Sequence, residues 1–163
     1  MGSFHAFATR PPVKPTSPFL PLVRELVRTY QAFERLSAGH VRSMGLTPAQ
    51  FDVVATLGNT EGLNPKQLGE KTLITKGTLT GVVDRLLDKG LVQRLPDPHD
   101  GRGQIVRLTE NGQALFETVF PAHVAYMAKA LSGFDRARLE PTQQALHALR
   151  QVLEQAGGTE DDA

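Results

Sequence analysis

The side chains that could do chemistry in this 163-residue sequence form two polar groups near the middle of the chain. The first group combines hydroxyls, an amide, glycines and charged side chains at short spacing, which suits contact with the base edges and phosphates of a DNA groove. Its members are Asn64, Lys66, Thr75, Lys76, Gly77, Thr78, Thr80, Gly81, Asp84 and Arg85. Each residue alone is more typical of a solvated helix face, so the pattern indicates DNA binding only as a set.

Asp84 fits a DNA-binding surface least well because its carboxylate is negatively charged. It could accept a hydrogen bond from a cytosine amino group, hold the neighbouring Arg85 in place, or simply repel phosphates. The sequence leaves these three roles open.

The second group lies in a segment rich in proline, aspartate and glycine at residues 96–103. Arg102 stands between two glycines, and an exposed arginine of this kind can enter the narrow minor groove of A·T-rich DNA. Asp100 lies two residues earlier and could orient the Arg102 guanidinium. The alternative is an ordinary surface turn with a loosely held arginine.

Other chemistries find no support in the sequence. Cysteine is absent and the five histidines form no pair at helical metal-ligand spacing, so neither a metal site nor a cofactor is predicted. A metal site would need histidines far apart in the sequence to meet in space. The sequence has no phosphate loop, dinucleotide fingerprint or nucleophile elbow, which argues against an enzyme.

Two short helices are predicted from their start signals. Residues 47–50 and 64–67 both contain a capping residue, a proline and, three residues after the cap, a glutamine. Proline is favoured at the first helical position, and the glutamine can complete a capping box. The helices are expected from 48 to the Gly58-Asn59 pair and from 65 to about 71.

A turn at 72–74 leads into a third helix over 75–89, with Thr75 as its expected cap. Its apolar residues share one face at helical spacing: Leu79, Val82, Val83, Leu86 and Leu87. Because that face must be buried, the opposite face is forced outward. It consists of Lys76, Gly77, Thr80, Gly81 and Asp84, with Thr75 and Thr78 in the first turn. Two helices joined by so short a turn form a helix-turn-helix, and β-prone runs at 91–95 and 104–108 predict a hairpin after it.

Longer amphipathic helices are predicted on both sides of this central part. One spans about 19–41, one begins at Thr109, and one begins near residue 139. Their apolar stripes are wider than a small central lobe could cover. Pro121 lies inside the second of these helices and is expected to kink or split it. The expected fold class is therefore mainly α with a small β-hairpin.

The two ends of the chain are predicted to be irregular. Residues 1–17 are rich in proline and predict a flexible arm, and residues 157–163 predict a disordered acidic tail. No apolar run approaches the roughly 20 residues that span a bilayer, and the start does not resemble a secretory signal, so a cytoplasmic location is expected.

Formal charge is positive over residues 1–112 and negative afterwards, so a polyanion should meet the first two thirds of the chain.

The segment 97–112 resembles the wing signature of the multiple-antibiotic-resistance regulator (MarR) family. In that family an Asp-x-Arg pair is followed by an alternating strand and a Leu-Thr-x-x-Gly helix start. The matching residues are Asp100, Arg102, Leu108, Thr109 and Gly112. Residues 73–90 are similar to the family's recognition helix. Gly101 stands where many members carry a second basic residue, which implies a weaker grip on phosphate.

The resemblance implies a homodimeric winged helix-turn-helix transcription factor, a repressor that binds a pseudo-palindromic operator in double-stranded DNA. Residues 46–112 would form the DNA-binding lobe, with the recognition helix at 75–89 and the wing at 91–108. Residues 18–45 and 113–156 would supply the N- and C-terminal dimerisation helices. A winged-helix protein-interaction module without sequence-specific DNA binding is the alternative.

The resemblance also implies an effector site. Family members are commonly released from DNA by a small aromatic or phenolic anion. Similarity assigns its site to Tyr30, Phe33, His40, Arg42 and Phe51. His40 and Arg42 would meet the anion, whereas each of the three aromatic residues, taken alone, is more typical of an ordinary core residue.

Overall fold

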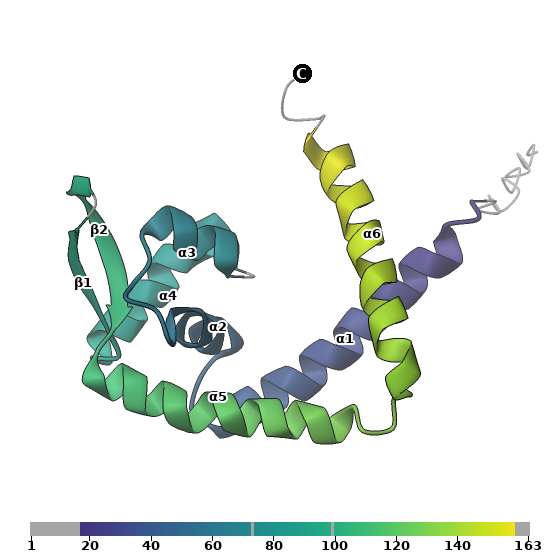
Figure 1. The fold of residues 1–163 in the computed structure, drawn as a ribbon, viewed down its shortest axis with the longest axis horizontal. Coiled ribbons are helices and arrows are strands. Elements are labelled where there is room, and N and C mark those ends of the chain that lie inside the picture. The colour runs from purple at the N-terminus through teal and green to yellow at the C-terminus, as the bar shows by residue number, and fades with distance from the viewer. Residues whose placement is uncertain (1–16, 73, 99, 159–163) are drawn as a thin grey trace, which may run out of the picture.

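The computed structural model describes residues 17–72, 74–98 and 100–158 and shows a small lobe from which long helices extend (Figure 1). Its elements are α1 Leu20–Ser43, α2 Pro48–Leu57, α3 Pro65–Lys71, α4 Lys76–Asp88, β1 Val92–Asp97, β2 Asp100–Leu108, α5 Glu110–Ala130, the 3-10 helix η1 Arg136–Arg138 and α6 Leu139–Gly158. This order confirms the expected fold class. Most of the predicted arm and tail, residues 1–16 and 159–163, lies outside the described residues.

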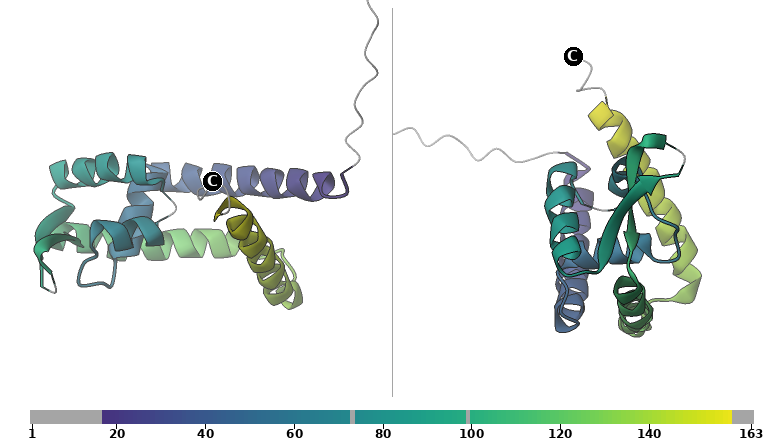
Figure 2. Two further views of the ribbon diagram at one scale, coloured as in Figure 1. Left: turned by 90° about the horizontal axis from the view of Figure 1, so that it is seen from above. Right: turned by 90° about the vertical axis from the view of Figure 1, so that its left-hand side faces the viewer.

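The lobe is built around an apolar core shared by α2, α3, α4, the hairpin and the start of α5. The hairpin stands beside these helices in both views of Figure 2. The buried residues of the core are Val53, Val54, Leu57, Leu63, Leu68, Leu79, Val82, Val83, Leu86, Val92, Val106, Leu108 and Phe116. The predicted inward face of α4 supplies four of them, each no more than 5% exposed, so that prediction is confirmed.

The predicted start signals of α2 and α3 form as expected. The Thr47 hydroxyl accepts from the Gln50 N–H at 3.2 Å, and the Gln50 side chain accepts from the Thr47 N–H at 3.1 Å. Asn64 and Gln67 make the same reciprocal pair at 2.9 and 3.0 Å. Each pair satisfies two backbone donors at a helix start, so both capping boxes are confirmed.

The β-hairpin is longer than predicted. Its antiparallel register begins with Val92 opposite Leu108, and the strands run on to Asp97 and Asp100. The predicted strand ends at 95 and 104 were therefore wrong, and most of the expected loop is strand. β1 has a neighbour on one side only and its register shifts after Pro96, two circumstances that let a strand accommodate a proline.

Pro121 does not split the helix, because α5 continues through it as one element, so that half of the expectation was wrong (Figure 1). Phe116 and Val119 before the proline, and His123 after it, are buried. Packing on both sides of Pro121 therefore offsets the cost of about 3 kcal/mol that proline imposes inside a helix.

Two smaller predictions at helix ends are corrected. Thr75 holds the N-cap position of α4, but its hydroxyl lies 3.0 Å from the Thr78 hydroxyl and makes no bond to a backbone N–H. The two hydroxyls form a hydrogen bond with each other instead.

The last helix extends further than predicted. α6 includes Gly157 and Gly158, which the sequence assigned to the tail. A terminal turn tolerates residues with weak helix propensity.

The long helices α1 and α5 pack against each other where they join the lobe. Val41, Leu46 and Val119 form a second, smaller apolar cluster at this junction. Beyond it, α6 projects away from the lobe and its side chains are almost all exposed (Figures 1 and 2). Within the described part of the chain, no helix combines the length and apolarity that crossing a bilayer requires.

Candidate nucleic-acid interface

The helix-turn-helix consists of α3, a short turn and α4. Thr72 is buried at the end of α3, where its hydroxyl donates to the Leu68 carbonyl at 2.8 Å and its N–H donates to the same carbonyl at 3.0 Å. These bonds close the helix and direct the chain toward α4. Of the turn residues, Leu73 lies outside the described part.

The outward face of α4 contains most of the residues predicted to meet DNA. The exposed members of the set are Lys66, Thr75, Gly77, Thr78, Thr80, Gly81, Asp84 and Arg85, while Asn64 is half-buried as the cap of α3. Lys76 begins α4, and Asp100 and Arg102 belong to β2; for these three residues the structure describes the backbone alone. The helix and the hairpin lie next to each other in the lobe (Figure 1).

Asp84 joins α4 to the hairpin. Its carboxylate accepts from the Arg94 guanidinium of β1 at 2.7 Å, a partner that is not among the three roles left open by the sequence. Arg94 was not predicted from the sequence, because the two residues meet only after the chain turns at Gly90. Both side chains are about half exposed, so the pair orients the wing rather than stabilising the fold strongly.

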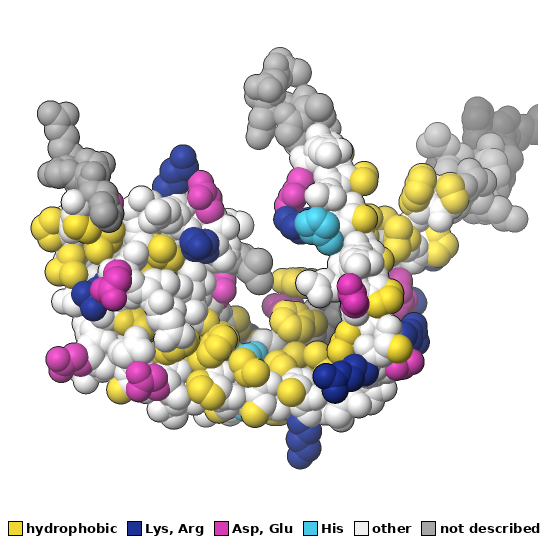
Figure 3. All heavy atoms as spheres, in the orientation of Figure 1, with side chains coloured by type: hydrophobic (Ala, Val, Ile, Leu, Met, Phe, Trp, Pro, Cys, Tyr) yellow, Lys and Arg dark blue, Asp and Glu magenta, His cyan; other side chains and the backbone are white. Residues whose placement is uncertain are grey.

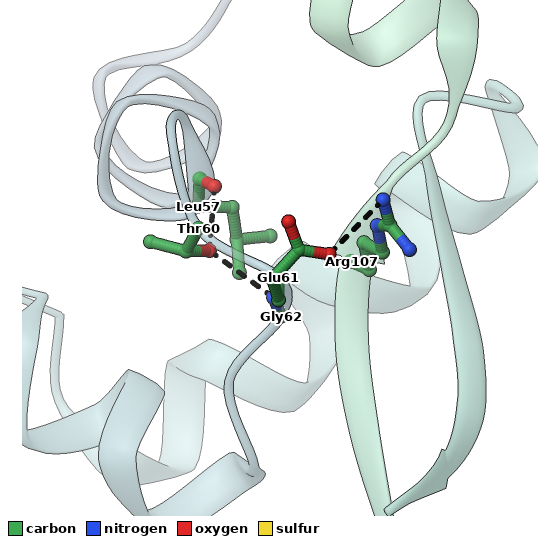
Figure 4. A network of polar contacts seen from close by, with 5 residues as sticks. All are labelled: Leu57, Thr60, Glu61, Gly62 and Arg107. Atoms are coloured by element: carbon green, nitrogen blue, oxygen red, sulfur yellow. Dashed lines mark hydrogen bonds and ion pairs between the residues drawn. The ribbon is translucent and has the colours of Figure 1, made fainter. Parts of the chain in front are cut away.

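A polar network supports the hairpin from the side of the α2–α3 loop (Figure 4). The Thr60 hydroxyl donates to the Leu57 carbonyl at 2.7 Å and accepts from the Gly62 N–H at 3.3 Å. Glu61 forms an ion pair with Arg107 of β2 at 3.3 Å. Leu63, which follows Gly62, pairs with Val106 of β2 in an isolated bridge. This loop therefore supports the hairpin on the β2 side, and the ion pair of Asp84 with Arg94 supports it on the β1 side.

A cavity of about 470 Å³ lies where the long helices meet the lobe. Tyr30, Phe33 and Phe51 line it, so the structure brings together three of the five predicted effector residues. His40 is not a lining residue, but it contacts His123, which is one. Arg42 is exposed and is not among the residues that line this cavity, so its role in meeting an anion stays a prediction.

A cluster around His123, which also lines this cavity, was not predicted from the sequence. His123 Nδ1 lies 3.1 Å from His40 Nδ1, and His123 Nε2 lies 3.3 Å from the Ser37 hydroxyl. The His40 ring stacks on Tyr126 at 4.1 Å between centroids, and the His123 ring tilts against Phe51 at 4.7 Å. Because these residues come from α1, α2 and α5, no local spacing could have revealed the cluster.

The histidine pair does not have the geometry of a metal centre. The two facing nitrogens are within hydrogen-bond distance of each other, which leaves no space for an ion between them. Among the described residues, no group of three or more histidine and acidic side chains could hold a metal ion.

Burial, and then the neighbouring His40, lower the pKa of His123 below its ordinary value of 6.5. As pH falls, the unfolded chain therefore binds a proton at this position before the folded protein does. The stability contributed by neutral His123 is fully present above about pH 6.5 and is lost as the pH falls toward the lower folded value. We expect acidification to lower the melting temperature less in His123→Gln than in the parent protein.

Thermal unfolding between about pH 7.5 and about pH 5.5 measures this difference. His147→Gln is the matched control, since His147 is an exposed histidine on α6. If His123→Gln and the parent lose stability equally on acidification, His123 is not the linked group.

These features together define a class of protein. A helix-turn-helix whose second helix exposes small polar residues, and which is fixed by an ion pair to an adjacent β-hairpin, is the architecture of a winged helix-turn-helix DNA-binding protein.

Comparison with known proteins identifies the family. The sequence model of the MarR family matches residues 44–103. The HTH-type transcriptional regulator MhqR of Bacillus subtilis is 30% identical over 131 residues, which cover 80% of this chain and 90% of that protein. The chain belongs to the MarR family, whose members are DNA-binding transcriptional regulators rather than enzymes.

Solved structures of the family share this fold. A mutant MarR from Escherichia coli complexed with operator DNA has a TM-score of 0.71 and 27% identity, covering 82% of this chain and 99% of that one. A structure of Bordetella bronchiseptica BpsR concerns regulation of its DNA binding by 6-hydroxynicotinic acid. It has a TM-score of 0.70 and 26% identity, covering 85% of this chain and 97% of that one.

Proposed function

We propose that the protein is a ligand-responsive homodimer that represses transcription in the cytoplasm by binding a pseudo-palindromic operator. In each protomer, α4 enters the major groove and the wing approaches the adjacent minor groove. The observation that carries this proposal is the division of α4 into an apolar face that is buried except at the partly buried Leu87 and an exposed polar face. The operator complex of the Escherichia coli relative supports it by similarity.

Exposed apolar side chains on α1 and α6 support the homodimer (Figure 3). The 20-residue α6 places Leu146, Leu149 and Leu153 along one side, yet only Leu149 among them is even half-buried. The exposed stripe of α1 and the residue before it comprises Phe19, Leu22, Val23, Val27, Tyr30 and Phe33. An isolated amphipathic helix is marginal in water, so a second copy of the chain that covers both stripes would stabilise them.

The cavity supports a response to a small ligand. Its walls come from the long helices α1 and α5 and from α2 and α4 of the lobe. A ligand that fills it would favour one arrangement of these parts over another, which is what release from DNA requires. Regulation of BpsR by an aromatic acid favours an aromatic ligand here by similarity.

Two substitutions test the DNA-binding assignment. We expect Lys76→Ala to weaken binding about tenfold on all duplexes alike, because a lysine at the start of α4 would meet phosphate. We expect Arg102→Ala to weaken binding about tenfold or more, and most on operators with A·T-rich flanks, because a minor-groove arginine reads groove width. Fluorescence anisotropy across a salt series measures both effects.

Lys129→Ala provides the control, since Lys129 is an exposed cation at the far end of α5. It should bind like the parent. Unchanged affinity in both Lys76→Ala and Arg102→Ala would contradict the assignment. A parent protein with no salt-dependent duplex binding would favour the protein-interaction module instead.

A further inference from the structure

The ion pair of Asp84 with Arg94 links the two parts of the lobe that are proposed to enter adjacent grooves of DNA. Asp84 follows Thr80 and Gly81 at helical spacing, so it shares the exposed polar face of α4 with them. Arg94 lies opposite Val106 in the hairpin, and directly opposed residues point their side chains to the same face of a sheet. Because Val106 is buried in the core of the lobe, Arg94 lies on the face of the hairpin that is turned toward α4.

A cation at this place would meet phosphate. The major and minor grooves of a duplex are separated by a sugar–phosphate strand. With α4 in the major groove and the wing in the adjacent minor groove, that strand crosses the lobe between them, where the pair lies. Arginine binds phosphate oxygens well, and such a contact adds affinity whatever the base sequence. A free Arg94 would therefore strengthen binding to unrelated DNA.

The contact with Asp84 withholds Arg94 from that role and restrains the wing. The N–O distance of 2.7 Å is that of a charge-assisted hydrogen bond, so the guanidinium is held against α4. Both side chains are about half exposed, so the pair adds little to stability. A restrained wing matters most on an operator, where α4 and the wing must read their grooves at the same time, since a preset geometry lowers the cost of binding.

We propose that Asp84 is a positioning residue that sets sequence specificity, because it holds Arg94 away from phosphate and fixes the wing relative to α4. In this role Asp84 contacts no base, which separates it from a carboxylate that accepts from cytosine. It also acts through Arg94 rather than by repelling phosphate itself. The inference rests on the orientation on DNA proposed above and adds a source of specificity to it.

Asp84→Ala tests the proposal with anisotropy on two duplexes. The operator probe is the duplex that the full-length parent protein selects from a randomised pool, and the second probe is a random-sequence duplex of the same length. We expect operator affinity to fall about threefold, because the wing is no longer held, and random-duplex affinity to rise about threefold, because Arg94 can bind phosphate. The ratio of the two affinities therefore falls about tenfold. The salt dependence of random-duplex binding should steepen by about one phosphate contact.

Two further variants separate charge from spacing. Adding Arg94→Gln to Asp84→Ala removes both charges, so random-duplex affinity should return to the parent value while operator affinity stays low. Glu61→Ala is the matched control, since it breaks the 3.3 Å ion pair with Arg107. Arg107 follows Val106 directly and so lies on the opposite face of the hairpin. Both affinities of the control should remain within about twofold of the parent values.

Four results would overturn the inference while leaving DNA binding in place. Unchanged affinities would show that the pair plays no part in binding, and a parallel fall on both duplexes would reduce Asp84 to a structural role. A parallel rise would show that its charge only repels phosphate. A loss at a single operator base pair would assign it to direct reading of that base. A parent protein that selects no duplex from the pool overturns the proposed operator binding, and the inference with it.

Discussion

Leu146→Asp combined with Leu153→Asp is expected to convert the proposed homodimer into monomers and to lower operator affinity about 100-fold or more. In the single chain these side chains are 51% and 55% exposed on α6, so the substitutions remove little packing within a protomer. In a dimer that buries the α6 stripe, each aspartate would lose its hydration without a partner charge. Losing the second DNA-binding lobe then removes the gain from binding two half-sites at once.

Light scattering after size-exclusion chromatography measures the assembly, and anisotropy with a complete operator measures affinity. Gln151→Asp is the matched control, because helical spacing puts Gln151 on the opposite side of α6 from the leucines. It should remain dimeric. A dimer that survives the double substitution would show that α6 does not form the interface.

Gly112→Ala is expected to lower the free energy of unfolding by about 3 kcal/mol, the upper end of the range for overpacking a buried site. Gly112 is buried in the first turn of α5, where its N–H donates to the Thr109 hydroxyl at 3.1 Å. A Cβ atom at this position would overlap the backbone carbonyl of Leu91. Backbone cannot move aside as a flexible side chain can, so α5 would have to shift away from the end of α4.

Urea unfolding of both proteins gives this difference. Gly69→Ala is the control, since a Cβ there would make only ordinary contact, at 3.6 Å from Leu79. That substitution should leave stability unchanged or raise it by about 0.5–1 kcal/mol, because alanine is favoured over glycine inside a helix. Equal stability of Gly112→Ala and the parent would show that α5 does not need this close approach to Leu91.

The Gly112 contact also explains part of the family resemblance in the sequence. The Leu-Thr-x-x-Gly pattern identified a helix start, and the structure supplies its reason. Thr109 holds the preceding turn through a bond from its hydroxyl to the Gly90 carbonyl at 2.6 Å, and Gly112 allows the backbones to meet. The resemblance likewise grouped Tyr30, Phe33 and Phe51, and all three line one cavity in the structure.

Features that depend on contacts within about four residues could be predicted from the sequence alone. The Thr47 and Asn64 capping boxes and the inward face of α4 are of this kind, because a helix brings residues three or four apart into contact whatever surrounds it. These local rules predicted the helix-turn-helix and the polar face that it exposes.

Other features needed the folded chain, because their partners lie far apart in sequence. Asp84 meets Arg94 only after the turn between α4 and β1, and His40 meets His123 only because α1 and α5 converge. Pro121 is accommodated because burial on either side of it outweighs its local preference. Long-range packing can override propensity and create cavities, so the cavity between the long helices and the lobe, and the histidine pair beside it, followed from the arrangement of helices rather than from any motif.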